Sequence, residues 1–156
     1  MQEKGGIGVK KKFVPLLAGL MTMASAVCYA TVPTDAVAIS GVAPGDSLES
    51  AKAKLGMPSQ VGDKFHFPNG IIVEVFDHNP NKVEEITAKT SQAGITPGGL
   101  KVGMEEAVII RTYGNPDKLD KDRDETEYTY YSADNMMEME FKVVKGTIVK
   151  IKCEYR

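Results

Sequence analysis

The sequence has few of the residues that usually build a catalytic, redox or metal centre. Its 156 residues include two cysteines and two histidines, and tryptophan is absent. Cys28 lies in the N-terminal segment described below, so the body of the chain retains only Cys153 and has no internal disulfide. The fold therefore depends on a hydrophobic core rather than on covalent cross-links.

Patterns for nucleophilic or phosphate chemistry are also lacking. No Ser, Thr or Cys lies in a nucleophile-elbow pattern. Cys153 alternates with Ile151 and Tyr155, which predicts a buried structural thiol. The run Gly5-Gly6-Ile7-Gly8 follows no strand pattern, so it does not indicate a phosphate loop. We expect no catalytic residue, no metal and no cofactor.

One uncharged stretch stands out, and it lies near the N-terminus. Four lysines precede residues 13–27, which carry no charge, and small residues follow. This pattern is typical of a signal peptide, which we predict over residues 1–30 with cleavage after Ala30. The alternatives are cleavage after Ala26, lipidation of Cys28, and a retained membrane anchor. The run is short for a transmembrane helix, so we expect no membrane span in the mature form.

The charge balance limits the classes of partner. Removing residues 1–30 takes away four of the 19 basic and one of the 21 acidic residues, which leaves a net charge of −5. An acidic body argues against nucleic acid or anionic lipid as the main partner. We expect an exported protein, periplasmic or secreted, with an outer-membrane lipoprotein as the alternative if Cys28 is lipidated.

Glycines and prolines recur at one fixed spacing. The first set is Gly41, Gly45, Gly56 and Pro58, and the second is Gly99, Gly103, Gly114 and Pro116. The two sets keep a constant offset, which predicts repeat 1 over residues 41–88 and repeat 2 over residues 99–156. Residues 31–40 are then a loose leader, and the small and polar residues 89–98 are a linker.

Each repeat has the pattern of one helix followed by strands. Asp46 or Ser47 can cap the first helix, and Gly56 can end it. The second helix ends at Gly114 and has a poorer cap, because Met104 stands where the first repeat has Asp46. Three alternating segments follow each helix. We therefore predict an α+β protein of two αβββ repeats, in which antiparallel meander sheets carry one helix per repeat on one face.

The segment from Gly103-Met104 to Gly114-Asn115-Pro116 resembles the BamE (SmpA/OmlA) outer-membrane assembly lipoprotein domain. Tandem copies of such a unit resemble the β-lactamase inhibitor protein fold. These resemblances imply a non-enzymatic protein-binding module of the cell envelope, with another envelope or secreted protein as its partner. The oligomeric state is left open.

The candidate binding residues are Tyr131 and Met136. If the alternating residues of two neighbouring strands pack inward, these two side chains point outward on either side of the turn at residues 133–135. The inward set is Tyr128, Tyr130, Met137 and Met139. An outward Tyr and Met beside the charged loop at residues 120–127 would form an apolar patch with a charged rim, as in protein-binding sites.

The alternative function is a small secreted hydrolase or metal-dependent enzyme that uses His66, His78 and the acidic loop at residues 120–127. That loop lacks the glycine and the glutamate of a calcium-binding EF-hand at the sixth and twelfth positions. Basic residues are also interleaved with its carboxylates. A solvated, salt-bridged loop is the better interpretation, and whether the histidines and the loop converge decides between the two functions.

We predict that the mature protein begins at Thr31, because a small residue precedes it and a turn-prone segment follows. N-terminal sequencing of the exported protein measures this directly. A lipid-modified Cys28 at the N-terminus would contradict the prediction.

Overall fold

The computed structural model describes residues 31–156, so the predicted signal peptide and lipidation site lie outside the described residues. A short 3-10 helix, η1 (Thr34–Ala36), comes first. The other elements are α1 (Leu48–Leu55), β1 (Ser59–Val61), β2 (Lys64–His66), β3 (Ile71–Phe76), β4 (Asn79–Ala88), α2 (Ala107–Tyr113), β5 (Lys118–Lys121), β6 (Glu125–Tyr131), β7 (Met137–Val144) and β8 (Thr147–Tyr155).

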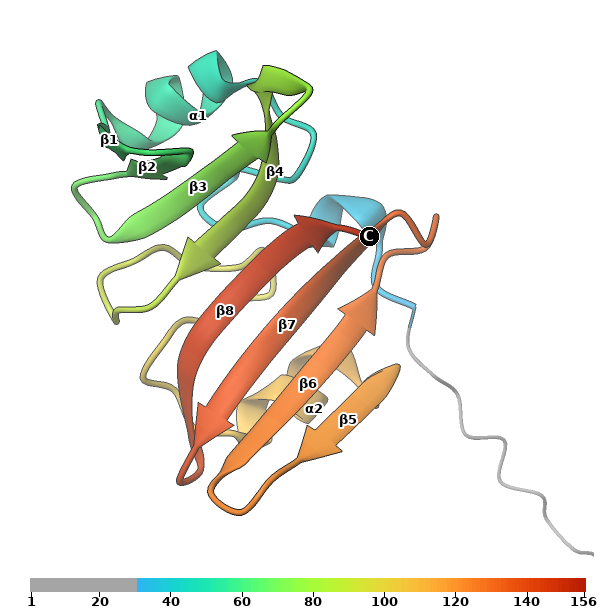
Figure 1. The fold of residues 1–156 in the computed structure, drawn as a ribbon. Coiled ribbons are helices and arrows are strands. Elements are labelled where there is room, and N and C mark those ends of the chain that lie inside the picture. Colours follow the sequence, from blue (N-terminus) through green and yellow to red (C-terminus); the bar gives the residue numbers. More distant parts are fainter. Residues whose placement is uncertain (1–30) are drawn as a thin grey trace, which may run out of the picture.

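All eight strands belong to one antiparallel sheet with the order β1-β2-β3-β4-β8-β7-β6-β5 (Figure 1). The first four strands and the last four meet where β4 pairs with β8. Four residue pairs form this junction, from Glu85 opposite Glu154 to Ala88 opposite Ile151. The pairing joins two meanders into one twisted sheet, so the chain has one continuous core.

The prediction of an α+β protein made of two αβββ repeats is wrong. The described chain is mostly β, with a single eight-stranded sheet and two helices of only eight and seven residues. Two of the strands, β1 and β5, were not predicted. Both are short edge strands whose residues are all exposed, so neither has the apolar alternation that marks a half-buried strand.

The helix boundaries follow the local signals. Ser47 caps α1 by accepting a hydrogen bond from the backbone N–H of Ser50 at 3.0 Å. Glu106 precedes α2 and gives no side-chain cap, so the poorer cap of that helix is confirmed. Gly56 and Gly114 end the helices with φ of 94° and 76°, as predicted. Their ψ angles, −168° and −158°, place both in a region that is essentially restricted to glycine.

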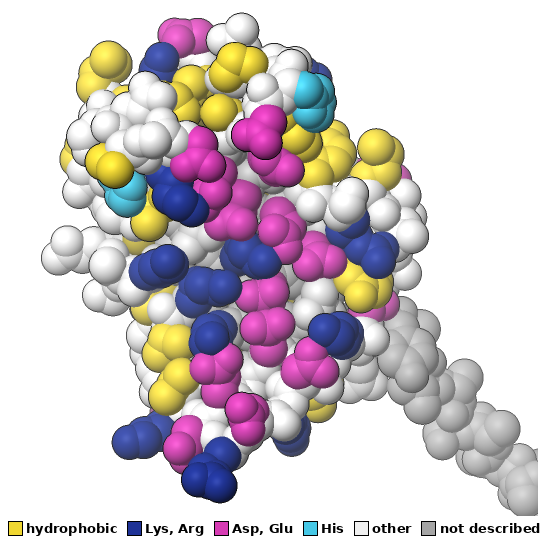
Figure 2. Space-filling model, viewed as in Figure 1, with side chains coloured by type: hydrophobic (Ala, Val, Ile, Leu, Met, Phe, Trp, Pro, Cys, Tyr) yellow, Lys and Arg dark blue, Asp and Glu magenta, His cyan; other side chains and the backbone are white. Residues whose placement is uncertain are grey.

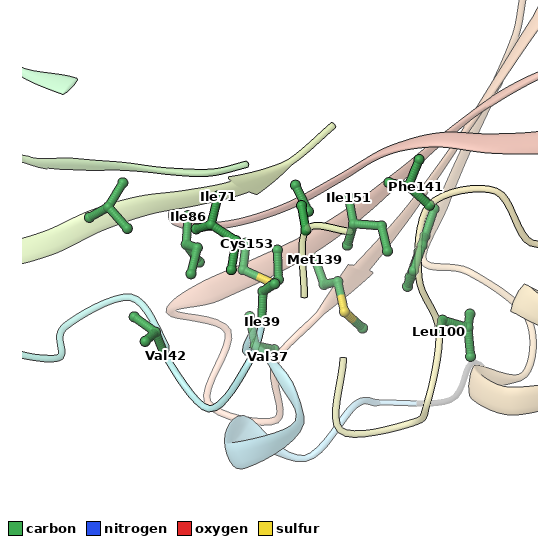
Figure 3. Packing of buried hydrophobic residues seen from close by; sticks show 14 of the residues in the cluster. Val37, Ile39, Val42, Ile71, Ile86, Leu100, Met139, Phe141, Ile151 and Cys153 are labelled. Carbon is green, nitrogen blue, oxygen red and sulfur yellow. The ribbon is translucent and has the colours of Figure 1, made fainter. Parts of the chain in front are cut away.

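The two faces of the sheet differ in character. Alternate residues of β3, β7 and β8 point into a core that both helices cover, as Figure 3 shows for part of it. On this face Tyr113 of α2 packs against Tyr130 and Phe141 with ring centroids 5.6 Å away in each case. Figure 1 shows the opposite face, which no helix of the described residues covers. We call it the outer face.

Residues 31–40 are not a loose leader. Val32, Val37 and Ile39 are fully buried in the core, because this segment lies under the sheet on the helix side. Val32 also bridges Ser132 at the end of β6. Residues 89–98, which we predicted to be a linker, are also fixed to the fold. The Tyr113 hydroxyl of α2 donates a hydrogen bond to Thr96 Oγ1 at 2.8 Å.

The other glycines and prolines of the spacing pattern lie where a loop contacts a strand or where an edge strand begins. The backbone N–H of Gly45 donates to Val83 of β4, and that of Gly103 donates to Ile148 of β8. Pro58 directly precedes β1, and Pro116 precedes β5. No helix within residues 31–156 is long and apolar enough to cross a membrane.

Replacing Gly56 with valine should lower the free energy of unfolding by about 1–3 kcal/mol, because a β-branched residue resists its backbone conformation. Gly114→Val should behave in the same way. The matched control is Ala53→Val on the exposed side of α1, which should cost only about 0.6 kcal/mol through helix propensity. Thermal or urea melts measure all three, and equal losses at positions 53 and 56 would contradict the helix-stop interpretation.

Candidate functional site

One end of the sheet gathers partly exposed aromatic side chains. Strands β3, β6 and β8 finish at this end, while β4 and β7 start there, because neighbouring strands are antiparallel. We define the aromatic rim as the residues that this arrangement brings together, which are Phe76, His78, Tyr131, Met136, Tyr155 and Arg156.

The rim is a chain of contacts across both halves of the sheet. His78, in the turn after β3, lies 5.1 Å from Phe76 between ring centroids. Phe76 in turn lies 5.4 Å from Tyr155, the last residue of β8. The backbone N–H of Arg156 then donates to the carbonyl of Met136 at 2.9 Å. The β4–β8 pairing is what places Phe76 and Tyr155 beside each other.

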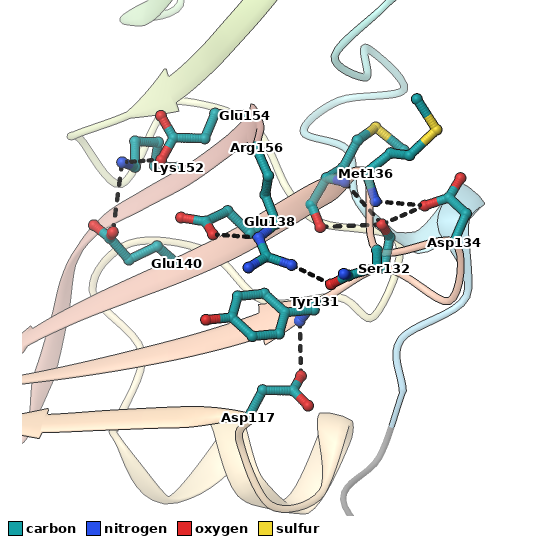
Figure 4. Close-up of polar contacts among 12 residues, drawn as sticks. Asp117, Tyr131, Ser132, Asp134, Met136, Glu138, Glu140, Lys152, Glu154 and Arg156 are labelled. Atoms are coloured by element: carbon teal, nitrogen blue, oxygen red, sulfur yellow. Dashed lines mark hydrogen bonds and ion pairs between the residues drawn. The ribbon is translucent and has the colours of Figure 1, made fainter.

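Arg156 and Tyr131 form the most closely packed part of the rim. The guanidinium carbon lies 3.8 Å from the centre of the Tyr131 ring, which is cation–π geometry. Nε of Arg156 is 3.4 Å from a carboxylate oxygen of Glu138, and Nη1 donates to Asn135 (Figure 4). Tyr131 itself is oriented by its backbone N–H, which donates to Asp117 Oδ2 at 2.7 Å.

The predicted inward residues of β6 and β7 are confirmed, since Tyr128, Tyr130, Met137 and Met139 are all buried. Tyr131 ends β6 and Met136 lies directly before β7, so the two residues flank the same turn, but they do not form a bare apolar patch. Arg156 covers the Tyr131 ring, and Met136 is the more accessible of the two, with 53% of its surface exposed.

The outer face beside the rim carries charge across several strands, as Figure 2 shows. Cross-strand pairing aligns four carboxylates in one row, namely Glu74, Glu85, Glu154 and Glu138 on β3, β4, β8 and β7. Like charges directly opposite each other destabilise a sheet. Ion pairs offset this repulsion, with Lys64 bound to Glu74 and Lys152 bound to Glu154.

Glu140 is the most buried carboxylate of the outer face, with 7% of its surface exposed. Burial by itself would raise its pKa, but the hydrogen bond and charge of Lys150, at 3.0 Å, and the charge of Lys152 hold the pKa below its ordinary value. Glu138 behaves in the opposite way. Burial and the facing carboxyl of Glu154 raise the pKa of Glu138 above its ordinary value.

Glu138, Glu140 and Glu154 bring carboxylate oxygens within 4.8 Å of one another, which is close enough to suggest a cation site. Lys152 contacts two of the three, Glu140 at 3.5 Å and Glu154 at 2.5 Å. The Lys152 ammonium therefore already supplies a positive charge to two of the three carboxylates. The chemistry that the cluster supports is a network of ion pairs.

The residues of the enzyme alternative do not converge. His66 lies on β2 opposite Ile72, and His78 contacts Phe76 at the far end of β3. The acidic loop joins β5 and β6, five strand spacings from β2 or about 24 Å along the sheet. A shallow hollow between Asp120 and Glu127 lies at that distant edge, and no histidine lines it.

Three rim residues escaped sequence reasoning. Tyr155 continues the alternation of Ile151 and Cys153, and Phe76 directly follows Val75 at the end of its strand, so neither stood apart from the ordinary strand pattern. Arg156 follows the last strand without a motif. The signal that could have found them is their shared place at strand ends, but it requires knowing that β4 and β8 are neighbours.

Glu138→Gln should stabilise the protein at pH 7 by about 0.2–1 kcal/mol, because it removes one of two facing carboxylates. The pKa of Glu138 is higher in the folded protein than its unfolded-state pKa of about 4.3, so the protonated carboxyl stabilises the fold below that pH. That contribution is lost as the pH rises through the folded-state pKa. The gain in melting temperature, about 1–5 °C, should thus vanish below about pH 4. Glu49→Gln on exposed α1 is the control and should change little, and an equal gain at pH 3.5 and pH 7 would contradict the assignment.

Comparison with known proteins shows the fold but no family. No protein-family model matches the sequence, and no curated protein does either. A cysteine-rich secretory protein from Staphylococcus aureus aligns with a TM-score of 0.53 at 14% identity, over 81% of this chain and 48% of that one. This chain thus spans about half of that protein, and the likeness concerns the fold alone.

Two further structures align less well. A DUF4309 family protein from Bacillus subtilis has a TM-score of 0.48 at 16% identity, over 71% of this chain and 79% of that chain. An extracellular protein containing an SCP domain from Bacillus anthracis has a TM-score of 0.45 at 12% identity, over 96% of this chain and 50% of that one. None of the three is described as a BamE-like or β-lactamase inhibitor protein.

Proposed function

We propose that this protein is an exported, non-enzymatic binding module that contacts another exported protein through the aromatic rim. The observation that carries the proposal is the gathering of two contact clusters at one end of the sheet. One is the ring series of His78, Phe76 and Tyr155, and the other is the stack of Arg156 on Tyr131. Tyr, Arg, Phe and Met are the side chains enriched at protein interfaces, and Tyr and Arg are the commonest hot spots.

The surroundings of the rim also support docking. Met136 is exposed on a turn held by Asp134 and Ser132, so its backbone is ordered while its flexible side chain remains free. Carboxylates of the outer face border the rim and supply a polar margin. An ordered surface of aromatic, Met and Arg side chains with a charged margin suits a partner that docks without a large rearrangement.

Export is the second part of the proposal, and it rests on the N-terminal sequence pattern. The charged start, the uncharged run and the small residues near position 30 are those of a signal peptide. The partner would then be another secreted or envelope protein. The acidic charge of the mature chain supports a protein partner rather than nucleic acid.

A photo-reactive amino acid at position 136 tests the proposal in the cells that produce the protein. We expect a defined cross-linked product from position 136 and none from position 110, since Ile110 is comparably exposed but lies on α2, on the helix side of the sheet. Tyr131→Ser should reduce the product several-fold by removing the support of Arg156. Equal cross-linking at both positions, or none at position 136, would contradict docking at the rim.

A further inference from the structure

We propose that Arg156 is the recognition residue of the aromatic rim, and that it stacks on an aromatic side chain flanked by basic residues in the partner. This inference rests on the proposed function, because it takes the rim to be the docking surface. It adds the chemistry of the partner segment, which follows from how the guanidinium is held.

The guanidinium is held on one flat face and at part of its edge by groups of the same protein. Nε forms an ion pair with Glu138 at 3.4 Å, Nη1 donates to Asn135, and the Tyr131 ring covers one flat face. The side chain still keeps 32% of its surface exposed. Tyr131 covers one face, and no residue labelled in Figure 4 lies against the opposite face, so we take the face turned away from Tyr131 to be the accessible one.

A flat, charged group with one face already stacked on a ring favours a planar π system on its other face. An aromatic ring can stack on the guanidinium and continue the stack that Tyr131 begins. A carboxylate, by contrast, binds arginine best through two parallel N–H groups. A second carboxylate would also have to share the guanidinium with Glu138, which is already paired with it at 3.4 Å, and the two anions would repel each other.

The charges around Arg156 also disfavour an anion. Asp117, Asp134, Glu138 and Glu154 lie on the turn and strand ends that surround the Tyr131–Arg156 stack. Lys152 is already bound between Glu140 and Glu154. The local field is therefore negative, and basic residues beside the aromatic side chain would complement it while acidic ones would be repelled.

Pre-organisation strengthens the case for Arg156. Its backbone N–H is bound to Met136, and its side chain is fixed by three further groups, so little rotamer freedom remains to be lost on binding. Met136, whose carbonyl accepts from the Arg156 N–H, is exposed on the neighbouring turn and offers a flexible apolar contact to the partner. Lysine at this position would keep the charge but lose the flat face.

Three blocked peptides test the inference by NMR titration of the full mature chain. They are Ac-Lys-Trp-Lys-NH2, Ac-Lys-Leu-Lys-NH2 and Ac-Glu-Trp-Glu-NH2. We expect the Lys-Trp-Lys peptide to shift the Arg156 Nε–H and Met136 signals with a Kd in the millimolar range. Its affinity should exceed that of each other peptide by about five-fold, and added salt should weaken it.

Two variants separate stacking from charge. Arg156→Lys should bring the affinity for the Lys-Trp-Lys peptide down to that for the Lys-Leu-Lys peptide, while Tyr131→Phe, which keeps the platform, should retain it. Equal binding of the Trp and Leu peptides, or tighter binding of the Glu-Trp-Glu peptide, would overturn the inference. If cross-linking at position 136 still occurs in that case, the proposal that a partner docks at the rim is kept. Only the inference of an aromatic side chain flanked by basic residues is rejected.

Discussion

The pairing of β4 with β8 is the constraint on which the rest of the molecule depends. Four residue pairs join two four-stranded meanders, and each meander alone would expose an edge and bury little apolar surface. Joined, they share one core that runs from Ile71 and Ile86 across to Met139 and Phe141. The same junction brings Phe76 against Tyr155 on the surface, so stability and the rim have a common origin.

The register in which β4 pairs with β8 determines which charged side chains face each other on the outer face. Because Glu85 and Glu138 both face Glu154, the junction forces carboxylates together, and lysines on the same strands compensate. Lys152 is held between two carboxylates for this reason. The arrangement explains why a cluster that has the composition of a cation site works as an ion-pair network, and why Arg156 at its end is held so firmly.

The helices and the N-terminal segment have supporting roles. With only eight and seven residues, α1 and α2 are too short to be stable alone, and each depends on packing against the sheet. Residues 31–40 complete the same layer, since Val32, Val37 and Ile39 fill space that the short helices leave open. Beyond the core, Val32 also binds the hairpin that presents Met136, which ties the start of the described chain to the rim.

Local features could be predicted from the sequence because they depend on neighbouring residues. The helix stops at Gly56 and Gly114, the cap at Ser47 and the inward faces of β6 and β7 all follow from backbone preference and alternation. The single sheet, the edge strands β1 and β5, the packing of residues 31–40 and the rim depend on which strands pair over long sequence distances. No periodicity encodes that choice, since every half-buried strand has the same pattern, and only the burial of one shared core selects the β4–β8 partnership.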